Sequence, residues 1–149
     1  MAEELAKKRQ QLIHAAESFV QAFTEKKPPE LLFSYFSEHI IIHEHGMQQL
    51  APYVGREFRG IEGAGEYFSI LASTITLEKA KLKSMFVDPK ESKVSVKGEA
   101  TSTWKETGQS WNEIWTSLLE FDDEYKIKVY EIWADQGAVY LASKGLLKQ

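Results

Sequence analysis

The sequence predicts a single α+β domain, residues 1–149, in which a cone-shaped, strongly bent antiparallel sheet wraps over three N-terminal helices. Three observations predict this fold. Apolar residues recur at helical spacing in the first half of the chain, they alternate at strand spacing in the second half, and short polar turns join the alternating segments. Helices that precede a sheet in this way cover one face of it and leave a pocket between the two layers.

The three helices are expected at residues 3–26, 29–37 and 61–73. The first has an apolar stripe at steps of three and four residues. Pro28 and Pro29 end it, and Pro29 also fits the first turn of the second helix.

Five strands are expected. The first begins at His39 and ends at Gly46, and the Gly- and Pro-containing segment up to Gly60 is predicted to be a loop. After Thr76 the period changes to two, and four strands joined by short turns form an antiparallel meander. The segments are Thr76 to the turn at 88–92, Val94–Trp104, Ser110–Phe121 and Tyr125–Asp135. A short helix is expected in the tail, at 137–147.

Composition excludes several classes of function. The net charge of −4 argues against nucleic-acid binding through a basic surface. No segment is apolar for long enough to span a membrane, and the N-terminus lacks the apolar core of a signal peptide. The absence of cysteine excludes disulfides and thiolate metal sites and fits a reducing compartment, so a cytoplasmic protein is expected.

The segment H-I-I-I-H-E-H-G, His39–Gly46, concentrates groups that titrate near neutral pH. In a strand, His43 and His45 share one face and Glu44 lies on the other. Acid–base chemistry by His43 or His45 in the pocket is one interpretation. Solvent exposure, a dimer contact or a structural hydrogen bond is the alternative. A metal site would need Glu131 or Asp135 as third ligand, because no His follows His45, and no metal is therefore expected.

Four motifs resemble the nuclear-transport-factor-2-like superfamily, and within it the SnoaL-like, polyketide cyclase-like branch. The resemblance covers about residues 8 to 143. The motifs are F-V-Q-A-F (Phe19–Phe23), H-E-H-G (His43–Gly46), G-R-E-F-R-G-I-E-G (Gly55–Gly63) and I-W-A-D-Q-G-A (Ile132–Ala138). The resemblance implies a cystatin-like α+β barrel, and homodimers are frequent in the superfamily. Its members include polyketide cyclases, ketosteroid isomerases, dehydratases, epoxide hydrolases and non-catalytic binding domains, so a shared fold does not transfer a function.

Asp135 is the second candidate acid or base. SnoaL-like cyclases use an aspartate near the end of the last strand, and Asp135 occupies a similar place. By alternation it shares a face with Glu131 and Trp133, which is expected to be the pocket face. The alternative is that Asp135 only caps the tail helix.

Aromatic residues could wall the pocket, although large rings are also common in cores. The candidates for ligand binding are Tyr67, Phe68, Trp104, Trp115, Glu131 and Trp133. Several members of the superfamily bind a substrate oxygen with a Tyr of the first helix, where this chain has Phe19 and Phe23. Tyr35, Tyr53 or Tyr67 could replace it. Both faces of the strand at 110–121 are partly apolar, which favours a homodimer.

Two functions remain open from the sequence. The first is an enzyme without a cofactor that binds a small, largely apolar carbonyl or polyketide-like compound. In this hypothesis His43 or His45, together with Asp135, moves protons in an isomerisation, cyclisation or dehydration. The second is a non-catalytic ligand-binding or protein-interaction module of the same fold.

Overall fold

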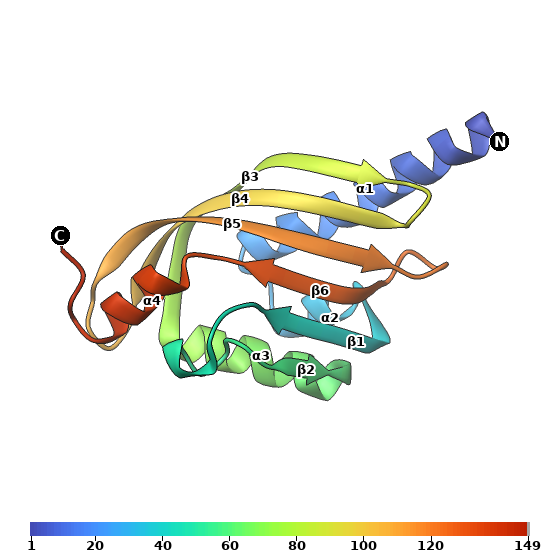
Figure 1. The fold of residues 1–149 in the computed structure, drawn as a ribbon. Coiled ribbons are helices and arrows are strands. Elements are labelled where there is room, and N and C mark those ends of the chain that lie inside the picture. The colour runs from blue at the N-terminus through green and yellow to red at the C-terminus, as the bar shows by residue number, and fades with distance from the viewer. Residues whose placement is uncertain (149) are drawn as a thin grey trace.

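A computed structural model describes residues 1–148 and contains the predicted succession of helices and strands (Figure 1). The helices are α1 (Ala2–Thr24), α2 (Pro29–Phe33), α3 (Gly60–Thr74) and α4 (Gln136–Ser143). The strands are β1 (Phe36–Glu44), β2 (Glu57–Arg59), β3 (Ile75–Asp88), β4 (Lys93–Trp104), β5 (Ser110–Phe121) and β6 (Ile127–Trp133). The predicted loop at 46–60 therefore also contains a short strand, β2, and a 3-10 turn, Gln48–Leu50.

The six strands form one curved sheet in the order β2-β1-β6-β5-β4-β3. The predicted antiparallel meander is confirmed for β3 to β6. The sheet as a whole is mixed, because β1 pairs in parallel with β6. This pairing places the first strand beside the last. The C-terminal ends of β1 and β6 lie side by side, just before α4 begins (Figure 1).

The long helix α1 and the short helix α2 lie on one side of the sheet, and α3 lies along β1 near its edge (Figure 1). Leu12, Ala16 and Phe19 are almost fully buried, at the helical spacing that the sequence shows. Phe19 makes edge-on contact with Tyr130 of β6, with ring centroids 5.3 Å apart. The inner face of the sheet and these helices therefore enclose a single apolar core.

Strand β1 alternates as the sequence predicts. Ile40, Ile42 and Glu44 are buried, whereas His43 and His45 are partly exposed. The two isoleucines have no exposed surface, and their burial against the helices decides which face of the strand points inward.

Strand β6 differs from its predicted alternation because it contains a β-bulge at Lys128. Cα pairs Phe121–Ile127 and Glu120–Val129 flank this extra residue. A one-residue insertion exchanges the two faces of everything that follows it. The residues after the bulge therefore face the opposite way from the expectation based on strict alternation.

Candidate functional site

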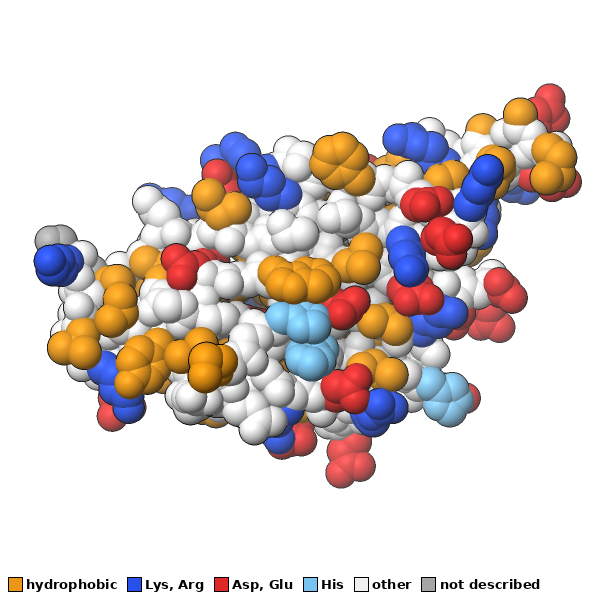
Figure 2. All heavy atoms as spheres, in the orientation of Figure 1, with side chains coloured by type: hydrophobic (Ala, Val, Ile, Leu, Met, Phe, Trp, Pro, Cys, Tyr) orange, Lys and Arg blue, Asp and Glu red, His pale blue; other side chains and the backbone are white. Residues whose placement is uncertain are grey.

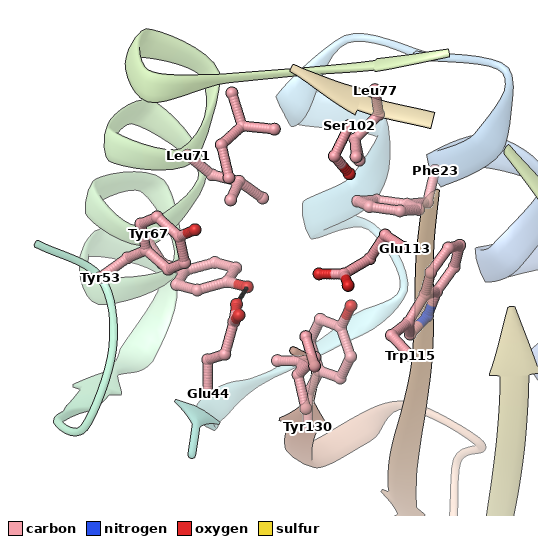
Figure 3. Close-up of a pocket in the computed structure, with 13 residues that line it drawn as sticks. Phe23, Glu44, Tyr53, Tyr67, Leu71, Leu77, Ser102, Glu113, Trp115 and Tyr130 are labelled. Carbon is pink, nitrogen blue, oxygen red and sulfur yellow. Dashed lines mark hydrogen bonds between the residues drawn. The ribbon is translucent and has the colours of Figure 1, made fainter. Parts of the chain in front are cut away.

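A cavity lies between the sheet and α3, and we call it the inner cavity (Figure 3). Its volume of about 60 Å3 accommodates several waters or part of a ligand. Its wall is mainly apolar and aromatic. The lining residues are Phe23, Glu44, Tyr53, Tyr67, Leu71, Ile75, Leu77, Ser102, Glu113, Trp115, Tyr130, Ile132 and Ala134.

Glu44 brings a buried carboxylate into this cavity from the end of β1. The Tyr67 hydroxyl on α3 donates a hydrogen bond of 2.7 Å to its Oε1, and Nε2 of Gln136 on α4 donates one of 2.6 Å to its Oε2. Burial raises the pKa of Glu44, and these two hydrogen bonds oppose the rise. Glu44 is thus held in position by two other elements, and an apolar environment favours its uncharged form.

Glu113 brings a second carboxylate into the cavity, from the middle of β5. Its side chain shares the inner face of the strand with Trp111 and Trp115 and is only 7% exposed. Burial raises the pKa of Glu113 to about 7, although the backbone N–H of Asp135 donates a long hydrogen bond of 3.4 Å to its Oε2. Figure 3 shows the Glu44 and Glu113 carboxyl groups reaching into the cavity from different sides.

Tyr53 reaches the cavity from the loop between β1 and β2. Gly55 turns this loop with a φ of +78°, a conformation that favours glycine, and its N–H donates to the Glu44 carbonyl oxygen at 2.8 Å. The turn packs Tyr53 against Tyr67, with ring centroids 6.3 Å apart. The hydroxyl of Tyr53 is buried and has no hydrogen-bond partner among residues 1–148. A buried hydroxyl without a partner has a donor and acceptor to offer to a bound molecule.

The cavity therefore combines groups that serve acid–base chemistry on a carbonyl compound. A carboxyl group with a pKa near 7 can accept a proton and return it at neutral pH. A buried tyrosine hydroxyl, or a carboxylic acid kept uncharged by apolar surroundings, can donate a hydrogen bond to a developing oxyanion. Tyr53 and Glu44 have these properties.

His43 and His45 lie outside the cavity, on the outer face of the sheet. Their rings stack at 4.2 Å between centroids, and the His45 ring stacks in turn on Trp133 at 4.6 Å. His45 Nε2 lies 2.9 Å from Glu131 Oε1. Figure 2 shows two neighbouring His side chains near the middle of the face it draws, beside exposed hydrophobic side chains. The geometry does not bring the two histidines to the cavity, so it gives no support to the predicted acid–base role, which stays a prediction.

Asp135 occupies the N-cap of α4. Its side chain is exposed and its Oδ1 accepts a hydrogen bond of 3.0 Å from the Ala138 N–H. This is the alternative that the sequence left open for Asp135. Asp135 is connected to the cavity only through its backbone N–H, which donates to Glu113, a lining residue.

The six predicted ligand-binding residues separate into three groups. Tyr67 and Trp115 line the inner cavity. Phe68 and Trp104 are buried in the core and do not line it. Glu131 and Trp133 lie on the outer face, in contact with His45, because the bulge at Lys128 turns Tyr130 and Ile132 inward in their place.

The sequence contains a signal for the two cavity carboxylates, Glu44 and Glu113, which are not among the candidates predicted from it. Glu113 alternates with Trp111 and Trp115 on an otherwise apolar strand face, and Glu44 alternates with Ile40 and Ile42. An acidic residue on a face of this kind must be buried with the apolar residues around it. Buried carboxylates have perturbed pKa values and are candidates for a functional site.

Two further arrangements are not found. Within residues 1–148, no three His, Asp or Glu side chains are grouped so that they could hold a metal ion. In the same part of the chain, no helix combines the length and apolar character that crossing a bilayer requires.

No protein-family model and no curated protein matches this sequence significantly. Solved structures do match the fold. An NTF2-like protein from Burkholderia pseudomallei K96243 matches with a TM-score of 0.77 at 10% identity, over 89% of this chain and 96% of that chain. A candidate SnoaL-like polyketide cyclase from Jannaschia sp. CCS1 matches with a TM-score of 0.73 at 13% identity, over 90% and 92% of the two chains. The pinacolase BvnE from Penicillium brevicompactum matches with a TM-score of 0.67 at 16% identity, over 87% and 86%.

Identities this low establish the fold and leave the activity open. The matches extend over most of each chain. The chain therefore has the nuclear-transport-factor-2-like fold, shared with SnoaL-like proteins, as its sequence motifs imply.

Proposed function

We propose that the protein is an enzyme that needs no cofactor and moves a proton within a small, largely apolar carbonyl compound. Isomerisation of a double bond is the simplest such reaction, and cyclisation and dehydration use the same proton transfers. The observation that carries the proposal is Glu113, a carboxyl group with a pKa of about 7 in an otherwise apolar cavity.

The proposed reaction has two proton transfers. The Glu113 carboxylate takes a proton from the carbon next to the carbonyl group, and the electron pair of that C–H bond forms an enolate. The Tyr53 hydroxyl, which has no partner in residues 1–148, donates a hydrogen bond to the enolate oxygen. The protonated Glu113 then delivers its proton to a different carbon of the same molecule, so that no oxidant or reductant is needed.

Glu44 and Tyr67 form the opposite wall of the proposed site. In its uncharged form, Glu44 can donate a second hydrogen bond to the substrate oxygen, and its raised pKa favours that form. The hydrogen bonds from Tyr67 and Gln136 fix its orientation. Tyr53 and Glu44 are thus the two candidate hydrogen-bond donors to the substrate oxygen, and they lie across the cavity from Glu113 (Figure 3). In this proposal they take the place of the first-helix tyrosine that this chain lacks.

The proposal can be tested with a β,γ-unsaturated cyclohexenone, whose conversion to the conjugated isomer is followed by ultraviolet absorbance. We expect turnover whose kcat/KM rises with pH up to about pH 7, because Glu113 must be ionised to accept the proton. Glu113→Gln should lower kcat by about 10²- to 10⁴-fold. Glu120→Gln, the same change on the outer face of the same strand, should leave kcat unchanged.

A wild-type rate in Glu113→Gln would refute the assigned role. Binding of the ketone without turnover, and without exchange of its α-hydrogens in deuterated water, would favour the non-catalytic binding module instead. The neighbouring structures support a reaction on small molecules only in general terms, since two of them carry the names of a polyketide cyclase and a pinacolase.

We propose in addition that two copies associate through the outer face of the sheet. Ile114 and Trp133 are 54% and 43% exposed there and lie on neighbouring strands, β5 and β6. Ile114→Lys should convert a dimer into a monomer in sedimentation velocity. Lys7→Glu, at an exposed position of α1, is the control for a changed charge away from this face. A wild-type protein that sediments as a monomer at high concentration would contradict this.

A further inference from the structure

A second, larger depression adjoins the inner cavity, and we call it the outer pocket. Its volume is about 320 Å3, and it lies between the C-terminal ends of α1 and α3, helix α2 and the start of β3. Phe23, Leu71, Ile75 and Leu77 line both spaces. Three of these residues lie on the side of the inner cavity away from Glu44 (Figure 3). The outer pocket and the inner cavity are therefore neighbours that share four apolar wall residues.

The outer pocket differs from the inner cavity in charge. Lys26, Lys27 and Lys105 line it, and none of its lining residues is acidic. The inner cavity contains two glutamates and no basic residue. In a chain whose net charge is −4, three lysines at one opening are a local reversal of sign. A molecule that spans both spaces would meet positive charge outside and carboxyl groups inside.

The three lysines come from two separate parts of the chain. Lys26 adopts a φ of +57° directly after α1, and Lys105 follows β4 and donates through Nζ to the Ala72 carbonyl oxygen near the end of α3. Lys27 Nζ lies 3.9 Å from Glu25, at the limit of an ion pair. Among residues 1–148, no acidic side chain forms an ion pair with Lys26 or Lys105. Their charges are thus available to an anion at the opening.

We propose that the substrate is an amphipathic organic acid whose carboxylate binds the three lysines at the outer pocket. Its apolar body lies against Leu32, Phe68 and Leu71 and its carbonyl end reaches Glu113 in the inner cavity. This inference rests on the proposed function, because it assigns the substrate class of that site. Charge sets the orientation of the ligand, since the Glu113 carboxylate repels an anion at the inner end and the lysines attract one at the outer end.

The inference is tested by comparing two ligands of equal shape, naphthaleneacetate and its neutral primary amide, by titration calorimetry. We expect the acid to bind wild-type protein about tenfold more tightly than the amide, since each exposed lysine contributes only a modest amount. Added salt should weaken binding of the acid and leave the amide unaffected.

The variant Lys26→Gln/Lys27→Gln/Lys105→Gln should bind the acid about tenfold more weakly and the amide with unchanged affinity. The matched control Lys7→Gln/Lys90→Gln/Lys97→Gln removes the same charge at exposed positions away from the pocket and should keep the wild-type preference. The double variant Lys26→Gln/Lys27→Gln retains the contact of Lys105 with α3. If the triple variant folds poorly, the double variant replaces it, and its affinity for the acid should fall by less than tenfold.

Equal affinity of the wild-type protein for the acid and the amide would overturn the inference. An equal loss of acid binding in the control variant would do the same. The binding result is independent of turnover: preference for the acid without isomerase activity would contradict only the proposed function. Isomerase activity on the neutral ketone without preference for the acid would contradict only this inference.

Discussion

Replacement of Glu113 by Gln tests how strongly the cavity disfavours a charged carboxylate. Burial raises the pKa of Glu113 in the folded protein to about 7 from its ordinary value of 4.5. Between these two pH values the folded protein binds more protons than the unfolded chain. The free energy of unfolding of the wild-type protein should therefore fall as pH rises from about 4.5 to about 7, and then stay level with respect to this group.

The size of this loss follows from the change in pKa. The interval from 4.5 to about 7 corresponds to at most about 3 kcal/mol. Glu113 is not completely buried, and solvent screening reduces this value, so we expect a loss of about 2 kcal/mol. Gln has nearly the same shape and no charge, so Glu113→Gln should not show this loss. At about pH 8 the variant should be more stable relative to wild type than at about pH 5, by about 2 kcal/mol.

Urea unfolding followed by tryptophan fluorescence, at several pH values between about 5 and 8, measures this difference. The pKa of Glu44 is also raised and that of His43 is lowered. Both groups are present in both proteins, and His43, on the outer face, should contribute equally to the two profiles. Glu120→Gln is the control and should follow the wild-type curve. Parallel pH profiles for wild type and Glu113→Gln would refute the reasoning.

Three further substitutions test the surroundings of the cavity. Tyr67→Phe removes a hydrogen-bond donor from buried Glu44 and should lower the free energy of unfolding in urea by about 1–3 kcal/mol. The loss should grow as pH rises above the ordinary glutamate value of 4.5, because the hydrogen bond stabilises the charged form of Glu44; a loss that does not change with pH would contradict this. Gly98→Ala would place a Cβ 2.2 Å from Cζ2 of Trp115. The melting temperature should therefore fall, and the free energy of unfolding should decrease by about 1–3 kcal/mol. Asp135→Ala removes the N-cap of α4 and should cost about 0.5–2 kcal/mol of stability while isomerase turnover persists; abolished turnover in a folded variant would restore Asp135 as a candidate acid or base.

Gly65→Ala is the matched control for Gly98→Ala. A Cβ at Gly65 meets only the Phe33 ring at 3.6 Å, an ordinary contact distance. The residue lies inside α3, where alanine is favoured over glycine by about 0.5–1 kcal/mol. The control should therefore raise the melting temperature, and a fall as large as that of Gly98→Ala would show that the collision with Trp115 is not the cause.

The layers of the fold can be predicted from the sequence because each depends on local periodicity. The apolar stripe of α1 and the alternation along β4 and β5 are visible in the amino-acid order and match the buried faces. The parallel pairing of β1 with β6 joins segments about ninety residues apart. The amino-acid pattern of neither segment indicates which strand it pairs with. Strand β2 is only three residues long, Glu57–Arg59, too short to show a period.

The site was less predictable for two physical reasons. The bulge at Lys128 depends on how β6 pairs with β5, and it reverses the faces of Glu131 and Trp133 without any glycine or proline to reveal it. Histidine as a residue type has an ordinary pKa near neutrality, whereas Glu113 reaches a pKa of about 7 only because the fold buries it. Residue type alone therefore favours His43 and His45 as acid–base groups, whereas burial in the folded protein favours Glu44 and Glu113.

The most direct test of the central claim is the titration of the Glu113 carboxyl group itself. The ¹³C chemical shift of its side-chain carboxyl carbon can be followed by NMR in protein labelled at glutamate. The signal is assigned by its absence from Glu113→Gln. We predict a midpoint at about pH 7 in the folded protein. A midpoint near the ordinary value of 4.5 would contradict the claim that Glu113 is the acid–base group of this cavity.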